Sequence, residues 1–438
     1  MDIRAILILV FFLLIAALMI TRKLPTFVAL IVMAVGICLI AGVPLVKPDG
    51  AETDQSLLTY ILAGGAAHMA GAMAAIYFGG WYGRMVTQTG VSRALITKAA
   101  ELGGDRPLII CLVLYAVLSF LWTNLSGLGS IIMTGSIAIP IMLSVGIPTV
   151  LAASIFLLAV TTGFNFNLYQ WKSFEQLTGV ERADMQKFAT ILFFITLVVS
   201  VAFIIFQFKK NGIKFAFAAK AEETDTAEDE EELIKGWRGV LCMISPLIPL
   251  VLVMAFKIEI IPAFLAAIIW LAIFSKGGFA KKMNMLSKTA HKGLQDVAMV
   301  IWLLVGIGIL VRAVMHPATK AVLQPMLQAI MPTSRIPFIL FFALLAPLSL
   351  YRGPLNLFGM GSGICALLVT AGIYTPLQAM GGFVACERLQ SVGCPTNSQN
   401  AWTCSYVGLD VNDVTKKLLP PLWIMAAAGA CVAGFLYL

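Results

Sequence analysis

Long apolar runs, separated by short polar stretches, make up nearly the whole chain. Runs long enough to cross a bilayer, which takes about 20 residues, recur from one end to the other. Examples are residues 3–20, 27–45, 189–206, 239–256 and 419–438. This pattern predicts an all-α polytopic membrane protein with on the order of ten crossings.

One long polar stretch, residues 209–238, interrupts the pattern near the middle of the chain. It contains the acidic run 222–232, and like charges at that density repel one another and cannot build a core. We therefore expect a solvated cytoplasmic linker between two membrane parts, residues 1–208 and residues 239–438.

Short motifs recur in the same order in the two parts, at an offset of about 226 to 237 residues. The matching pairs are residues 24–27 and 261–264, Pro107 and Pro337, Gly127 and Gly353, and residues 145–147 and 371–373. No single match carries weight, but their common order predicts an internal repeat. Repeats of this kind are the usual construction of secondary transporters.

The distribution of Lys and Arg predicts how the chain is oriented in the membrane, because cytoplasmic loops are richer in these residues. Placing the more basic loops in the cytoplasm leaves 19 Lys and Arg residues inside and 9 outside, with Arg352 and Arg388 at membrane depth. Each part then has five transmembrane helices and one re-entrant hairpin, at about residues 107–146 and 337–372. An odd number of crossings inverts one part relative to the other. Both termini then lie on the periplasmic side of a bacterial inner membrane.

Composition narrows the possible functions. The 438 residues are 60% hydrophobic and only 12% charged, which excludes a soluble fold. Eight dispersed cysteines and three histidines without ligand spacing indicate neither a disulfide framework nor a metal site. No Walker loop or catalytic constellation points to an enzyme or to a catalytic residue, and the dispersed lysines give no nucleic-acid surface. No cofactor is expected.

The tips of the two predicted hairpins carry the first candidates for a substrate site. Non-helical backbone at membrane depth is tolerated where protein or a water-filled cavity satisfies it, and small polar side chains supply the hydrogen bonds. The candidates are Thr123, Asn124, Ser126 and Gly127 in the first tip, and Arg352, Gly353 and Asn356 in the second. Hydroxyl groups that only bond to helix carbonyls are the structural alternative.

Arg352 is the candidate with the most distinctive chemistry. An arginine in mid-membrane is costly and is a functional hypothesis by default. Its guanidinium offers two parallel hydrogen bonds to a carboxylate. The alternatives are a structural salt bridge, for instance to Glu387, or a side chain that reaches to the membrane interface.

A helix that breaks in a polar cluster follows each hairpin. Pro395 lacks an N–H and predicts unwinding in the second part. Freed N–H groups attract anions and freed carbonyls attract cations. The candidates here are Thr161, Thr162 and Asn165 in the first break, and Thr396, Asn397 and Ser398 in the second. A kink satisfied by neighbouring side chains is the alternative.

Glu387 precedes the second break by about two helical turns. A carboxyl group at this depth is a candidate for coupling transport to an ion. A structural role is supported equally well.

Two hairpins, two broken helices and five crossings per inverted part resemble the ion transporter superfamily. This superfamily includes divalent anion–sodium, citrate–metal and gluconate–proton symporters. Residues 76–90, which begin Ile-Tyr-Phe-Gly-Gly-Trp-Tyr-Gly-Arg and end Thr-Gly, look like the third-helix pattern of its gluconate and citrate branches. The resemblance implies an alternating-access carrier and a homodimer formed through outer helices.

The sodium-coupled branch of that superfamily carries Ser-Asn-Thr at its hairpin tips. This chain has Thr123-Asn124 at the first tip, but residues 351–354 read Tyr-Arg-Gly-Pro at the second. The departure favours coupling to H⁺ over coupling to Na⁺.

The expected function is secondary active transport of a small organic anion, such as gluconate, citrate or a dicarboxylate. The alternative is a cation/proton antiporter or an anion channel of the same superfamily. An antiporter favours aspartates at membrane depth, and no aspartate falls in a predicted span.

Overall fold

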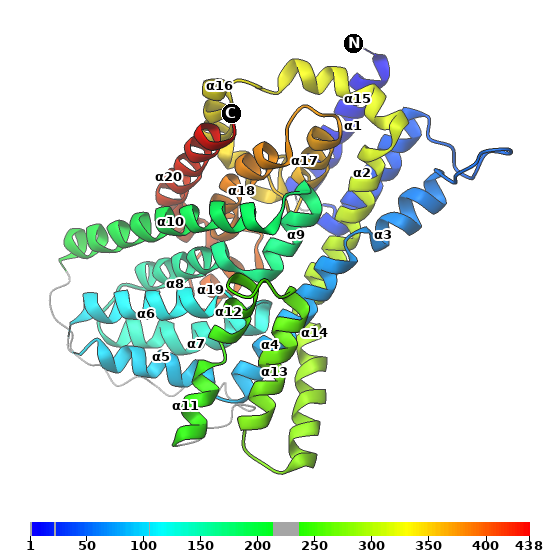
Figure 1. Ribbon diagram of the computed structural model, residues 1–438. Coiled ribbons are helices and arrows are strands. Elements are labelled where there is room, and N and C mark those ends of the chain that lie inside the picture. Colours follow the sequence, from blue (N-terminus) through cyan, green and yellow to red (C-terminus); the bar gives the residue numbers. More distant parts are fainter. Residues whose placement is uncertain (1, 22, 105, 213–235) are drawn as a thin grey trace.

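The computed structural model describes residues 2–21, 23–104, 106–212 and 236–438. Most of the predicted linker, including the acidic run 222–232, therefore lies outside the described residues. Within them every regular element is a helix (Figure 1). The prediction of an all-helical membrane protein is confirmed.

The first part of the chain begins with two antiparallel helices and ends with a helix of 30 residues. Its elements are α1 (Ile3–Ile20), α2 (Thr26–Ala41), η1 (Leu57–Ala63), α3 (Gly64–His68), α4 (Ala70–Gln88), α5 (Val91–Leu102), α6 (Pro107–Leu121), α7 (Leu128–Ser144), α8 (Thr149–Gly163), η2 (Phe164–Phe166), α9 (Leu168–Thr178) and α10 (Arg182–Asn211).

The second part follows a similar order of long and short helices. Its elements are α11 (Trp237–Ile244), α12 (Leu247–Met254), α13 (Ile260–Phe274), α14 (Phe279–Met315), α15 (Pro317–Ile330), α16 (Arg335–Leu345), η3 (Ala346–Arg352), α17 (Gly361–Thr370), α18 (Pro376–Gly393), α19 (Ser398–Tyr406) and α20 (Val411–Tyr437).

Familiar sequence signals set many of these helix ends. Pro107 stands at the first position of α6, where a missing N–H costs nothing. Thr375 and Gln378 form a capping box at the start of α18. Gly42, with φ +83°, ends α2 in the left-handed conformation that glycine tolerates best.

Six helical segments of the described chain are long and apolar enough to cross a membrane. The bent pair α11 and α12, with an angle of 47° between its two helices, makes a seventh. The number is below the expected ten because several apolar helices are short. The 15-residue α13, for example, is only about 23 Å long, less than the hydrocarbon core of a bilayer.

The long helix α14 packs along α3 and α4 through glycines (Figure 1). A Cβ at Gly308 would lie within 3 Å of the Gly65 carbonyl oxygen, and a Cβ at Gly293 would meet the backbone of Trp81 equally closely. Small residues at such positions let two membrane helices approach each other. One helix from each part thus forms a central contact.

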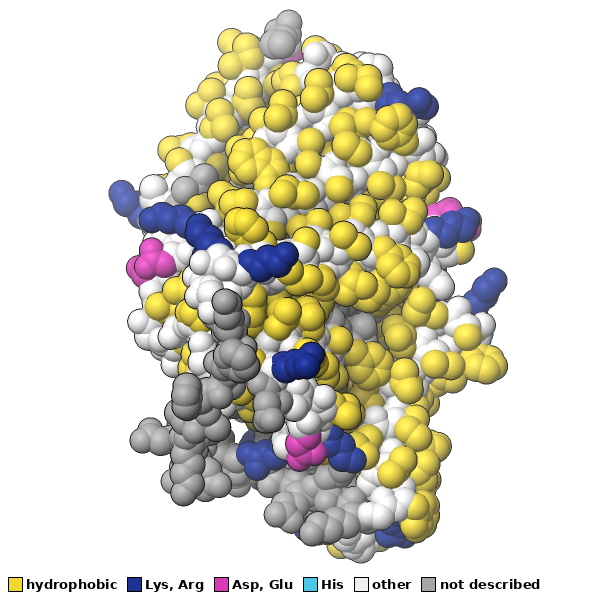
Figure 2. Space-filling view, turned by 90° about the vertical axis from the view of Figure 1, so that its left-hand side faces the viewer, with side chains coloured by type: hydrophobic (Ala, Val, Ile, Leu, Met, Phe, Trp, Pro, Cys, Tyr) yellow, Lys and Arg dark blue, Asp and Glu magenta, His cyan; other side chains and the backbone are white. Residues whose placement is uncertain are grey.

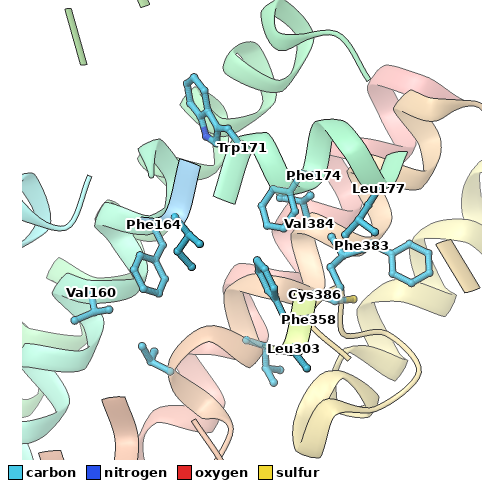
Figure 3. Close-up of a cluster of buried hydrophobic side chains, with 14 of the residues drawn as sticks. Val160, Phe164, Trp171, Phe174, Leu177, Leu303, Phe358, Phe383, Val384 and Cys386 are labelled. Atoms are coloured by element: carbon cyan, nitrogen blue, oxygen red, sulfur yellow. The ribbon is translucent and has the colours of Figure 1, made fainter. Parts of the chain in front are cut away.

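A second contact between the parts is a cluster of buried side chains (Figure 3). Phe164 and Phe174 come from η2 and α9, whereas Leu303, Phe358 and Phe383 come from the second part. The rings of Phe174 and Phe358 lie 5.8 Å apart, centroid to centroid. Hydrophobic side chains are also dense over the upper part of the face in Figure 2, as expected for contact with lipid.

Candidate functional site

A cavity of about 300 Å³ opens where the two parts meet. Its walls come from the α6–α7 turn, α7, η2 and α9 in the first part, and from α14, η3, α18 and α19 in the second. Small-molecule sites begin at about this volume. The polar and charged side chains that line it are Tyr169, Gln170, Gln295, Asp296, Arg352, Glu387, Gln390, Ser391, Asn397, Ser398 and Gln399.

One wall is the start of α7, which no side chain caps. Gly127 precedes it with φ +83°, and a Cβ at Gly129 would collide with the carboxylate of Asp296 and the guanidinium of Arg84. That guanidinium donates two hydrogen bonds to Asp296, with Nε–Oδ2 and Nη2–Oδ1 distances of 2.5 and 2.6 Å. The first turn of α7 therefore lies against a charge-paired aspartate.

The opposite wall contains the break between α18 and α19. Asn397 donates hydrogen bonds to the carbonyls of Gln390 and Ser391, at 2.9 and 3.0 Å. Asn400 donates to the Val392 carbonyl at 2.6 Å. These amides satisfy the carbonyls that the break frees, which is the structural alternative for Asn397. Asn397 nevertheless lines the cavity, with Ser398 and Gln399 beside it.

Arg352 reaches the cavity from a strained turn. Its φ is +60° and that of Tyr351 is +53°, values that side-chain-bearing residues rarely adopt. Two glycines make the turn possible, since a Cβ at Gly353 would overlap the Leu348 carbonyl and a Cβ at Gly359 would overlap Arg352. Nη1 of Arg352 donates to the Phe358 carbonyl at 3.0 Å. No ion pair of Arg352 occurs within the described chain.

Glu387 also lines the cavity, although its side chain is only 1% exposed. Its Oε2 has no hydrogen-bond partner among the described residues. It interacts electrostatically with Arg388 and Arg352, but neither makes a salt bridge with it in the part of the chain described. The structural salt bridge considered for Arg352 is therefore not formed.

Arg388 bonds to residues of the first part of the chain. Its guanidinium donates to the Thr161 carbonyl, Asn165 Oδ1 and Gln170 Oε1, each at 3.4 Å. All three acceptors are neutral. The Thr161 hydroxyl returns a hydrogen bond to the Arg388 carbonyl at 3.3 Å, so Arg388 joins the two parts.

Five of the fourteen residues selected from the sequence line the cavity: Gly127, Arg352, Glu387, Asn397 and Ser398. They come from the first hairpin tip, the second hairpin tip, the second break and the part of α18 before that break, which the structure brings together. Their roles stay predictions.

The other nine residues do not line the cavity: Thr123, Asn124, Ser126, Thr161, Thr162, Asn165, Gly353, Asn356 and Thr396. Several bond to the backbone, as the structural alternative requires. Thr162 donates to the Leu158 carbonyl at 2.9 Å, and Asn356 donates to the Ser349 carbonyl at 2.9 Å. Asn124 reaches the Pro246 carbonyl in the second part at 2.8 Å.

Sequence reasoning missed Asp296, Gln170 and Gln390. We expected no aspartate in a predicted span, but Asp296 lies within the 37-residue α14, one of the helices long and apolar enough to cross a membrane. Its partner Arg84 is 212 residues away in the chain, so no local pattern indicates the pair. Gln170 and Gln390 were missed because a single glutamine on a helix has no motif or spacing that marks it as a binding residue.

The site offers no metal centre among the described residues, since no group of three His, Cys, Asp or Glu side chains could hold an ion. It is a small cavity with an arginine, inside an all-helical membrane protein. These features suit a membrane protein that binds a small anion.

Comparison with known families agrees with this class. Residues 3–384 match the DcuC family, described as C4-dicarboxylate anaerobic carrier, and the chain belongs to that family. It is therefore a carrier of small organic anions and not an enzyme. A search among curated proteins found no match. The matched segment contains Arg352 and stops just before Glu387 and Arg388.

Proposed function

We propose that this chain transports C4 dicarboxylates across a bacterial inner membrane as a secondary carrier. The observation that carries the proposal is Arg352, a cation that lines the cavity and has no ion pair within the described chain. A half-buried arginine without an ion pair still gains when a counter-charge bonds to it directly. A substrate carboxylate supplies that charge, with the planar fork of the guanidinium as its partner.

The cavity also has neutral partners for an anion. No side chain caps the start of α19, and Asn397, Ser398 and Gln399 at that end line the cavity. The first N–H groups of a helix have no partner within it and favour negative charge. Together with Arg352 they form a surface suited to carboxylate.

We further propose the two inverted repeats, residues 1–208 and 239–438, with alternating access between them. The similar element order supports a repeat. Contacts between segments expected on one side support the orientation. Arg182 Nη2 lies 3.0 Å from Glu259 Oε2. This ion pair joins the segments around residues 172–187 and 257, which are both among the less basic loops that the charge count places outside. In this proposal the termini are periplasmic, the hairpins are re-entrant as in the ion transporter superfamily, and the carrier is a homodimer.

Protons are the proposed coupling ion, and Glu387 is the proposed proton acceptor. The charged or titratable groups that face it are Arg352 from η3, Tyr169 from α9 and its own neighbour Arg388. A carboxylate among these groups is a counter-charge for them in the empty carrier. When a dianion enters, its two negative charges pair with the two arginines, and the negative charge of Glu387 is left over. A proton on Glu387 removes that remaining charge.

The antiporter alternative gains nothing from Asp296, because Arg84 already neutralises it. The carrier is tested with full-length protein purified in detergent. Calorimetry and thermal shift with succinate, fumarate and malate should give binding, because a ligand of the folded state stabilises it. Gluconate, citrate and acetate serve as controls. Binding of gluconate or citrate with no response to any C4 dicarboxylate would contradict the proposal.

A further inference from the structure

Arg388 is a buried cation that its surroundings hold only loosely. Its side chain is 1% exposed, and its Nε has no hydrogen-bond partner among the described residues. Its three acceptors are all neutral and all 3.4 Å away, beyond the 2.7–3.2 Å of a typical N–H···O bond. A charge-assisted hydrogen bond is normally shorter, about 2.7–2.9 Å. The site therefore solvates the guanidinium incompletely.

Only one of these acceptors belongs to the cavity. Gln170, on α9, lines the cavity and also accepts from Nη2 of Arg388. Its side chain is the link between the guanidinium and the open space. If the amide moved aside, the two N–H groups on that edge of Arg388 would be available to a ligand in the cavity.

Arg352 and Arg388 act on the same region of the cavity. Tyr169 and Glu387 both line it, and each interacts electrostatically with both arginines. The two guanidinium groups therefore flank a common space, one from η3 and one from α18. A ligand with two anionic ends matches this arrangement better than a ligand with one.

We propose that Arg388 binds the second carboxylate of the substrate, which takes the place of the Gln170 amide. This inference rests on the proposed function and adds the residue that distinguishes a dicarboxylate from a monocarboxylate. In the empty carrier Gln170 and Asn165 hold the guanidinium as neutral stand-ins. The dianion replaces a long neutral contact by a charged, two-pronged one.

Charge counting agrees with this assignment. Two arginines neutralise the two carboxylates of the substrate, while the pair Arg84 and Asp296 stays neutral by itself. Among the described residues that line the cavity, Glu387 is then the one acidic group without a counter-charge. The same count requires a proton on Glu387 when a dianion is bound.

The test compares succinate with succinamate, in which a neutral amide replaces one carboxylate at nearly the same shape. Calorimetry on the purified full-length carrier gives the dissociation constant of succinamate divided by that of succinate, which is the ratio used below. In the unaltered protein the ratio should be about 30 or more, as expected for loss of one partner of a buried charged pair. In Arg388→Gln the ratio should fall to within about threefold of one, because no charge is left for the second carboxylate.

A structural arginine would give a different result. If Arg388 is only structural, Arg388→Gln would weaken the binding of both ligands by the same factor and leave the ratio at its original value. That result would overturn the proposal. Arg335→Gln, on the exposed arginine at the start of α16, is the matched control and should leave the ratio unchanged. If the unaltered protein binds no C4 dicarboxylate, the proposed function itself fails, and the two failures are thus distinct.

A second variant covers the case that Arg388→Gln does not fold. Gln170→Ala removes the acceptor that competes with the substrate and keeps the cation. The ratio should then rise above that of the unaltered protein, because Arg388 no longer gives up an existing partner. A ratio that stays the same or falls in a folded Gln170→Ala carrier overturns the proposal.

Discussion

At the residue scale, the site depends on a backbone that few residues tolerate. Positive φ at Tyr351 and Arg352 costs on the order of 1–3 kcal/mol each. Packing around Gly353 and Gly359 holds this geometry, because each glycine passes a backbone carbonyl too closely for a Cβ. The arginine is thus fixed before any ligand arrives, which lowers the entropy lost on binding.

The first prediction concerns the charge and shape of Arg352. Arg352→Lys keeps the charge but loses the planar fork, so succinate affinity should fall markedly. Arg352→Gln should cost more, about 2–5 kcal/mol of binding free energy. Calorimetry in detergent measures both. Unchanged binding by a folded Arg352→Gln carrier would show that helix ends and amides hold the anion alone.

The second prediction concerns Glu387 and pH. Transport of a dianion with a proton should become faster as external pH falls, because protonated Glu387 is required in the loaded state. Glu387→Gln mimics the protonated carboxyl permanently, so uptake by proteoliposomes should lose most of its pH dependence. Exchange of internal for external succinate should remain. A variant that keeps the full pH dependence would rule out Glu387 as the proton acceptor.

At the element scale, the sequence predicts where helices break better than what the broken ends do. Pro395 and Asn397 lie between α18 and α19. In the first part the break is the 3-10 turn Phe164–Phe166 with Asn167, so that Thr161 and Thr162 belong to the last turn of α8. Glycine, proline and amide clusters are local signals, so this information is available without a structure. Whether an amide faces the cavity or bonds to a carbonyl depends on how each helix is rotated about its axis. That rotation is set by packing against distant segments, so no short stretch of sequence predicts it.

The third prediction concerns the ion pair between α4 and α14. Asp296→Asn should leave the guanidinium of Arg84 without its carboxylate and destabilise the protein by about 1–3 kcal/mol, since both groups are partly shielded from water. Thermal unfolding in detergent measures the loss. The exchanged pair, Arg84→Asp with Asp296→Arg, should recover part of it. Equal damage from the double and the single variants would indicate that geometry at Gly129, and not charge, is limiting.

The fourth prediction concerns the glycine contact between α3 and α14. Gly308→Ala places a Cβ within 3 Å of the Gly65 carbonyl, so the helices must separate. Overpacking of this kind costs about 1–3 kcal/mol. Gly278→Ala is the matched control, because nothing lies within 4 Å of a Cβ at that position. Unfolding temperatures of the two variants should differ clearly, and equal values would mean that the contact is loose.

At the scale of the whole molecule, the sequence predicts the class of protein and the division into two parts. Hydropathy is averaged over long segments, so it predicts membrane helices without any knowledge of how they pack. The number of spans is harder, since helices of 15 or 16 residues such as α13 and α2 fall below the length of a full crossing. The cavity cannot be predicted from the sequence, because its walls combine residues that are more than 200 positions apart in the chain.

The last prediction tests the orientation on which the inverted repeat depends. The loop after α2 and the loop before α13 belong to different parts of the chain, yet both are expected outside. Single cysteines at Asp49 and Lys257, which are exposed, should react with a membrane-impermeant maleimide added to intact cells. Cysteines at Lys276 and Lys416 should react only after the cells are opened.

The natural cysteines interfere little with this assay. Seven of the eight are buried, and Cys431 can be replaced by alanine as the common background. Labelling of Asp49→Cys but not of Lys257→Cys from outside would give the two parts the same orientation instead of opposite ones. Parts with the same orientation are not related by a two-fold axis in the membrane plane, so they cannot exchange conformations to turn an outward-open state into an inward-open one. That result would remove the structural basis for the alternating access proposed for this carrier.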